Sequence, residues 1–149
     1  MDGDAKKIAF DALKDAWYKR DGLYSRYAKS VGLNYSTILV LQILFDSTGV
    51  YTQKEICEML GLPKQYIHAI IKSFWEQGYV ILKEAKDRRN KDILVTDKGI
   101  EYARTILSPL EKAESAALCG FSCDEIESHA VFTGKYVDSL ETALNSLYS

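Results

Sequence analysis

Residues 52–67 read TQKEICEMLGLPKQYI and predict two short helices joined by a tight turn. Thr52 and Glu55 have the spacing of a capping box, in which a hydroxyl and a carboxylate close the first turn of a helix. Gly61 ends that helix, and Pro63 suits the first turn of the next one, where its missing N–H is no loss. Because only about three residues connect the two helices, the pattern is that of a helix-turn-helix.

A β-hairpin is expected directly after the second of these helices, which ends at Gly78. Residues 79–82 and 93–95 are rich in β-branched and apolar side chains and predict two paired strands. Residues 83–92 connect them and hold five basic and three acidic side chains. Thr96 follows as the cap of another helix. The helix before the hairpin buries Ile67, Ile70, Ile71 and Phe74.

Amphipathic helices are predicted on both sides of this central segment. Residues 4–31 repeat apolar side chains every three or four positions. A second helix begins at the capping residue Asn34 and is apolar nearly all round, so we expect it at the centre of the fold. Residues 100–118 form a further helix, and a second capping box, Ser122 with Glu125, opens the last one.

The order of these elements predicts a fold that is mainly α with a small β-hairpin wing. We expect a single domain of residues 1–149, in which residues 33–99 form a winged helix-turn-helix. The helical segments at residues 4–31 and 100–148 carry apolar stripes that a core of about 70 residues does not cover. We therefore predict that these segments form the two-fold interface of a homodimer.

The acidic charge of the chain is concentrated in its last third. Residues 51–99 carry nine basic and seven acidic side chains, residues 100–149 carry three and eight, and the net charge is −2. An acidic protein still binds nucleic acid when its positive charges share one face. No run of about 18 apolar residues is present, and residues 1–7 alternate in charge, unlike a signal peptide. Together with only three cysteines, these features predict a cytoplasmic protein.

Residues 51–99 resemble the winged helix-turn-helix of the MarR family of transcription regulators. The resemblance rests on residues 52–67, on DRRNK at residues 87–91 of the wing, and on VTDKG at residues 95–99. It implies a homodimeric regulator, usually a repressor, that binds a palindromic operator in double-stranded DNA. It also implies that a small-molecule effector, or an oxidant, releases the DNA.

The resemblance further implies an effector pocket between the first, second and fifth helices. Trp17, Tyr24 and Tyr27 stand on the first helix. An aromatic stripe at helical spacing is more typical of a core than of a ligand site, so we assign no effector-binding residue.

Nine residues are predicted to contact DNA, six on the second helix of the helix-turn-helix and three in the wing. Gln65 carries the amide that can pair with adenine, and Arg88 and Arg89 are placed to reach the minor groove. Asp87 is expected to pair with an arginine and to hold the wing in shape, as in the family. The predicted DNA-binding residues are Lys64, Gln65, Tyr66, His68, Lys72, Ser73, Arg88, Arg89 and Lys91.

Two departures from the family pattern support an alternative function. Ala69 stands where the family often has an arginine, and Asp92 stands where a basic residue is common. With the acidic last third, they leave open a winged-helix protein-interaction module that has lost DNA binding.

Neither a cofactor nor an enzymatic activity is expected. Cys119, Cys123 and His129 do not have the spacing of a zinc site, and a redox or metal role for the two cysteines stays open. Cys57 is expected to pack in the interior. The first helix has no cysteine, which disfavours the oxidant switch of some relatives. Phosphate-binding and nucleophile motifs are absent from the sequence, and the two histidines, His68 and His129, lie far apart in it.

Overall fold

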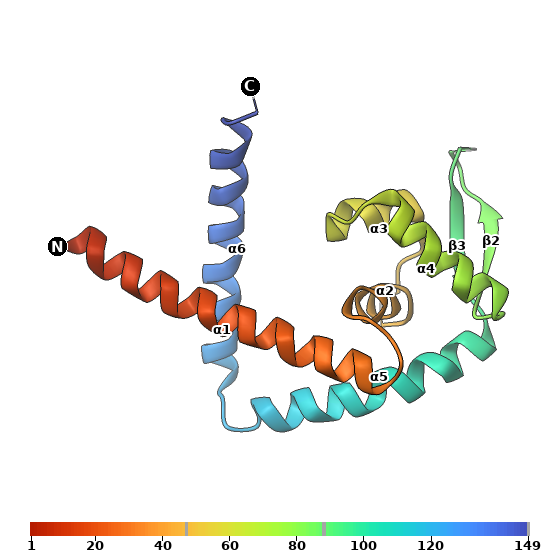
Figure 1. Cartoon of the computed structure of the whole chain (residues 1–149), viewed down its shortest axis with the longest axis horizontal. Helices are drawn as coiled ribbons and strands as arrows, with labels where there is room; N and C mark the ends of the chain where they lie inside the picture. Colours follow the sequence, from red (N-terminus) through yellow and green to blue (C-terminus); the bar gives the residue numbers. More distant parts are fainter. Residues whose placement is uncertain (47, 88, 149) are drawn as a thin grey trace. The chain divides into compact units, whose positions relative to one another are not determined.

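A computed structural model describes residues 1–46, 48–87 and 89–148, with the elements in the predicted order (Figure 1). The helices are α1 (Asp2–Ser30), α2 (Tyr35–Phe45), α3 (Gln53–Leu60), α4 (Lys64–Glu76), α5 (Asp97–Leu118) and α6 (Cys123–Asn145). The strands are β1 (Tyr51–Thr52), β2 (Val80–Glu84) and β3 (Lys91–Val95). The predicted fold class, mainly α with a small β-hairpin, is confirmed.

The chain divides into two compact units, residues 1–109 and residues 110–149. In the first unit α2 is the core helix, as its apolar sequence predicted. Its buried residues are Thr37, Ile38, Val40, Leu41 and Leu44. The face predicted to be buried on α4 is also confirmed, with Ile67, Ile70, Ile71 and Phe74 all buried.

The turn between α3 and α4 forms as the capping residues predicted. The Thr52 hydroxyl accepts from the Glu55 N–H at 3.2 Å, and the Glu55 carboxylate accepts from the Thr52 N–H at 3.1 Å. Gly61 ends α3 in the left-handed conformation, with φ of 63°, which favours glycine. Pro63 takes the N-cap position of α4, one residue before the first turn where it was expected. Side-chain caps also form where predicted at Asn34 and Ser122.

The sheet is larger than the hairpin that the sequence predicted. β2 and β3 pair antiparallel from Val80 opposite Val95 to Glu84 opposite Lys91, so only residues 85–90 connect them. The prediction made both strands too short because charged residues near a turn resemble a loop, whereas exposed positions of a strand tolerate them. β1, which pairs with β3, was missed because two residues carry no periodicity.

Gly99 lies where α5 begins against the backbone of the preceding hairpin. A Cβ atom at this position would lie 2.1 Å from the carbonyl oxygen of Tyr79. Thr96 also holds the start of α5 against the residues before β2. Its hydroxyl donates to the Gly78 carbonyl at 2.6 Å and accepts from the Gly99 N–H at 3.0 Å. Close backbone contact therefore requires glycine at position 99.

Tyr27 joins α1 to α5 within the first unit, since its hydroxyl donates to the Ile106 carbonyl. Burial raises the pKa of the Tyr27 hydroxyl. Above about pH 10 the unfolded chain therefore binds fewer protons than the folded chain, and the free energy of unfolding falls as pH rises. We expect Tyr27→Phe to lower the free energy of unfolding by about 1 kcal/mol at neutral pH and to reduce its alkaline decline.

Urea denaturation between about pH 8 and pH 11 measures both effects. The matched control is Tyr18→Phe, because the Tyr18 side chain on α1 is 67% exposed. An alkaline decline that is the same in Tyr27→Phe and in Tyr18→Phe would contradict the role assigned to the Tyr27 hydroxyl.

α1 runs without interruption from Asp2 to Ser30. No single helix in the described ranges is both long and apolar enough to cross a membrane. α1 and α2 meet that test only as a pair, bent by 87°. The buried position of α2 in the core accounts for its apolar composition.

Candidate nucleic-acid interface

Side chains from α3, α4 and the wing line one cleft of about 470 Å³. Lys64 and His68 line it from α4, and Arg89, Asn90 and Lys91 line it from the wing. The cleft therefore brings together four of the residues predicted to bind DNA, from two segments of the chain that the fold places side by side. We call this cleft, lined by these five residues and by α3, the wing cleft.

The packing of α4 determines which of its side chains reach the wing cleft. Ile67 and Ile71 are completely buried, so the opposite side of the helix is exposed. Because residues four apart lie on the same face of a helix, Lys64 and His68 share one flank. The tight turn at Gly61 holds α3 beside that flank.

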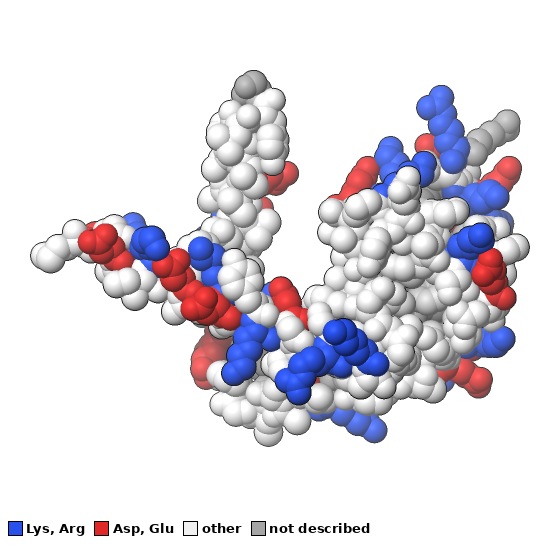
Figure 2. Space-filling model, in the orientation of Figure 1, with Lys and Arg blue, Asp and Glu red and all other residues white. Residues whose placement is uncertain are grey.

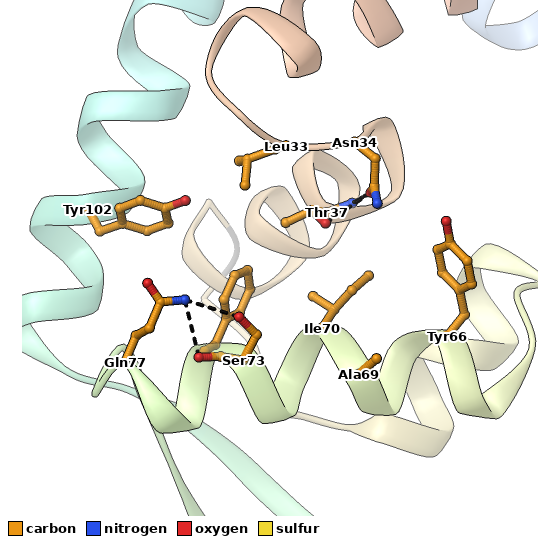
Figure 3. Close-up of a pocket in the computed structure, with 10 residues that line it drawn as sticks. Leu33, Asn34, Thr37, Tyr66, Ala69, Ile70, Ser73, Gln77 and Tyr102 are labelled. Atoms are coloured by element: carbon orange, nitrogen blue, oxygen red, sulfur yellow. Dashed lines mark hydrogen bonds between the residues drawn. The ribbon is translucent and has the colours of Figure 1, made fainter.

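The other α4 residues predicted to bind DNA lie elsewhere on the helix. Tyr66 and Ser73 border a second cavity, on the flank of α4 opposite to Lys64 (Figure 3). Gln65 and Lys72 are exposed, and the Lys72 Nζ lies 3.9 Å from the Glu76 carboxylate. The predicted residues of α4 therefore all lie on its exposed side, between the flank that borders the wing cleft and the flank that borders the second cavity.

Asp87 shapes the tip of the wing through hydrogen bonds. Its carboxylate accepts from the Arg89 N–H at 3.1 Å and from the Asn90 side-chain amide at 3.2 Å. The Asn90 N–H also donates to the Asp87 carbonyl at 3.0 Å. These bonds support the structural role predicted for Asp87, while its pairing with an arginine side chain stays a prediction. Arg88 lies outside the described residues.

The wing cleft is rich in positive charge. Lys54, Lys64, Arg89 and Lys91 line it, and Glu58 is the one carboxylate among its described lining residues. None of these four cations forms an ion pair within the part of the chain that the structure describes. Figure 2 shows basic side chains gathered over the end of the first unit where the wing and α4 lie. Unpaired cations around a cleft suit the phosphates of a nucleic acid.

α3 also contributes to this cleft, a contribution not predicted from the sequence. Gln53 and Lys54 line the cleft from the first turn of α3, and the Gln53 Oε1 lies 3.4 Å from the His68 Nδ1. Gln53 and Lys54 directly follow the capping residue Thr52, and this position at the exposed start of a helix could have indicated their role. Cys57, which was expected to pack in the interior, is half-buried and also lines this cleft.

The remaining cysteines lie between α5 and α6 and at the start of α6. Cys119 and Cys123 are free and exposed. Across residues 1–46, 48–87 and 89–148, no three His, Cys, Asp or Glu side chains are grouped to hold a metal ion.

Comparison with known proteins gives matches in sequence over part of the chain and in structure over most of it. Residues 31–90 match the model of the MarR family. No curated protein matches the chain. NMB1585, a MarR family regulator from Neisseria meningitidis, is 22% identical with a TM-score of 0.79, and the match covers 93% of this chain and 97% of that chain.

Two further solved structures are similar. MepR from S. aureus, in its DNA-binding conformation, is 16% identical with a TM-score of 0.74, over 89% of this chain and 98% of that chain. A putative MarR family transcriptional regulator from Listeria monocytogenes, complexed with 26mer DNA, is 20% identical with a TM-score of 0.68, over 88% of this chain and 87% of that chain.

The sequence match and the structural matches complement each other. Residues 31–90 contain α2, α3, α4 and β2, together with the wing-cleft residues Lys64, His68 and Arg89. The structural matches cover most of the chain and so include the flanking helices, at identities that establish the fold. Residues 31–90 match the model of the MarR family, and the chain as a whole has the winged helix-turn-helix fold of the solved MarR family regulators.

Proposed function

We propose that the chain is a homodimeric transcriptional repressor that binds a palindromic operator in double-stranded DNA and is released by a small-molecule effector. The observation that carries the proposal is the wing cleft, where Lys64 and His68 of α4 face Arg89 and Lys91 of the wing. The DNA bound to the Listeria monocytogenes relative supports it. Because the proposed target is chromosomal DNA, a cytoplasmic location is part of the proposal, and no catalytic step is assigned.

In the proposed complex α4 enters the major groove and the wing follows the neighbouring minor groove. Gln65 pairs with adenine, while His68 donates to a base edge or a phosphate. Lys64 and Lys72 neutralise phosphates. Arg89 at the wing tip inserts where a narrow A·T tract concentrates negative potential. Tyr66 and Ser73 remain predicted contacts on the other flank of α4.

The apolar surface of α6 supports the proposed homodimer. α6 has 23 residues, none of which is buried in the single chain. Contiguous exposed apolar surface of this kind marks an interaction site in most proteins. Figure 2 shows the face of α6 in this view with few charged side chains. The exposed large apolar residues of α6 are Ile126, Val131, Phe132, Val137, Leu140 and Leu144.

We expect the double variant Val137→Asp, Leu144→Asp to be monomeric, because two charges on the same stripe cannot be buried in a two-fold interface. Sedimentation equilibrium measures the mass, which for the unmodified protein is twice the 16.8 kDa of one chain. Lys135→Asp with Thr142→Asp is the control, because both positions are polar residues of the same helix. A dimer that survives the first pair of changes contradicts the proposed interface.

Release by an effector is a shift between two states of the dimer. The DNA-binding state holds its two α4 helices about 34 to 36 Å apart, one turn of the double helix. A ligand that prefers a state with another spacing of the two α4 helices, by about 1 to 3 kcal/mol, lowers the affinity for the operator about 5- to 150-fold.

A gel shift with random duplex at low salt tests the proposal against its rival. A DNA-binding protein retards the duplex, and added salt releases it, since binding displaces counterions from the phosphates. Ala69 and the half-buried Asp92 still motivate a protein-interaction module. Absence of retardation at low salt favours that module.

A further inference from the structure

His68 and Gln53 contact each other within the wing cleft, from the two helices of the helix-turn-helix. The His68 Nδ1 on α4 lies 3.4 Å from the Gln53 Oε1 on α3. Gln53 is the first residue of α3 and is half-buried, and the capping box of Thr52 and Glu55 holds the backbone on which it stands. The His68 side chain is exposed. A carboxamide held by its helix therefore lies beside a ring that is open to a ligand.

The chemistry of the two groups determines which nitrogen of the His68 ring carries the proton. A carboxamide oxygen only accepts, so a hydrogen bond between these atoms requires a proton on the His68 Nδ1. The Nε2 of a neutral ring is then an acceptor, and it becomes a donor when the ring takes up a second proton. A histidine without such a partner favours the opposite arrangement in water, with the proton on Nε2. Gln53 therefore determines what the Nε2 of His68 can bind.

The titratable and charged groups around His68 come from three elements of the fold. They are Lys54, Cys57 and Glu58 of α3, Lys64 and Lys72 one turn away on α4, and Arg89 and Lys91 of the wing. Glu58 supplies the one negative charge among the described residues that line the cleft. The negative charge that pairs with a protonated His68 ring therefore comes mainly from the phosphates of bound DNA.

We propose that Gln53 is a positioning residue that makes the recognition of DNA by His68 depend on pH. With its Nδ1–H directed at Gln53, the neutral ring offers only an acceptor at Nε2, which suits the amino group of cytosine or adenine. The protonated ring offers a donor, which suits a phosphate or the N7 and O6 of guanine. Histidine changes charge between about pH 5 and pH 8. Because the complex then holds one proton more than the free protein, its affinity rises as pH falls through this range.

This assignment rests on the proposed function, in which His68 donates to a base edge or a phosphate. While Gln53 occupies the Nδ1–H, that donation comes from Nε2 and requires the protonated ring. The tautomer of the neutral ring is a property of the free protein and is measured without DNA. A failure of the contact with Gln53 is therefore distinguishable from a failure to bind DNA.

Two-bond ¹H–¹⁵N spectra of the ¹⁵N-labelled full chain at about pH 8.5, where histidine is neutral, report the tautomer of each ring. The chain has two histidines, so the signals of His68 are those that disappear in His68→Gln. We expect the His68 ring to carry its proton mainly on Nδ1 in the unmodified protein and mainly on Nε2 in Gln53→Met. Methionine keeps the unbranched shape and the helix propensity of glutamine and removes the acceptor. A proton mainly on Nε2 in the unmodified protein overturns the proposal.

Fluorescence anisotropy with the selected duplex between about pH 5.5 and pH 8 measures the consequence for DNA binding. We expect the unmodified protein to bind about tenfold more tightly at the acidic end, and His68→Gln, which takes up no proton, to lose most of this difference. His129→Gln changes the other histidine and is expected to keep it.

In Gln53→Met the neutral His68 ring is free to donate from Nε2, so the difference is expected to shrink to about threefold through a gain in affinity at the alkaline end. A contact with a merely structural role would instead lower the affinity of Gln53→Met at every pH. A pH dependence that is the same in Gln53→Met and in the unmodified protein contradicts the proposal.

Discussion

Gly99→Ala is expected to lower the free energy of unfolding by about 2 to 4 kcal/mol and the melting temperature by about 5 to 15 °C. The added Cβ would lie 2.1 Å from the Tyr79 carbonyl oxygen and 3.1 Å from the Phe45 ring. Removing this overlap requires the start of α5 to move away from the hairpin, and that movement stretches the Thr96 bonds to Gly78 and Gly99. Thermal and urea denaturation followed by circular dichroism measure the change.

Gly22→Ala is the matched control for this substitution. Gly22 lies inside α1, and a Cβ there meets nothing within 4 Å. Alanine is the better helix former, so we expect Gly22→Ala to stabilise the protein by up to about 1 kcal/mol. If Gly99→Ala is as stable as Gly22→Ala, then α5 does not approach the hairpin as described.

The double variant Lys64→Ala, Arg89→Ala is expected to bind its selected operator about 10 to 100 times more weakly at about 0.1 M salt. One cation comes from α4 and the other from the wing, and both line the wing cleft. If each neutralises one phosphate, the slope of log K against log salt falls by about two units, and Arg89→Ala alone lowers it by about one. Fluorescence anisotropy over a salt series measures affinity and slope together.

Lys19→Ala with Arg104→Ala makes the same change of charge at two exposed positions on α1 and α5. Neither residue lines the wing cleft, so affinity and slope are expected to stay close to those of the unmodified protein. Equal losses in both double variants indicate that binding depends on overall charge rather than on the cleft.

Local signals in the sequence were sufficient for most of the helices. The capping box of Thr52 and Glu55, the stop at Gly61 and the apolar face of α4 act within a few residues of one another, and all appear in the structure. The ends of β2 and β3 were wrong because strand length depends on pairing between residues such as Glu84 and Lys91. No pattern within one segment reports that pairing.

The candidate site could be predicted only where it depends on local spacing within one helix. Helical spacing placed Lys64 and His68 on one flank of α4, but the neighbours of each flank depend on tertiary packing. Gln53 joined the wing cleft, while Tyr66 and Ser73 bordered a different cavity. The second cavity arises where α2, α4 and α5 meet, and its residues share no motif along the chain.

The most direct test is hydroxyl-radical footprinting on a duplex that the protein itself selects from a random library. It shows whether the two wing clefts of a dimer each bind one half of the operator. We expect two symmetric protected regions with centres about 10 to 10.5 base pairs apart, or a multiple of that spacing. Protection of a single unpaired region, or a library from which no duplex is retained at low salt, would contradict this expectation.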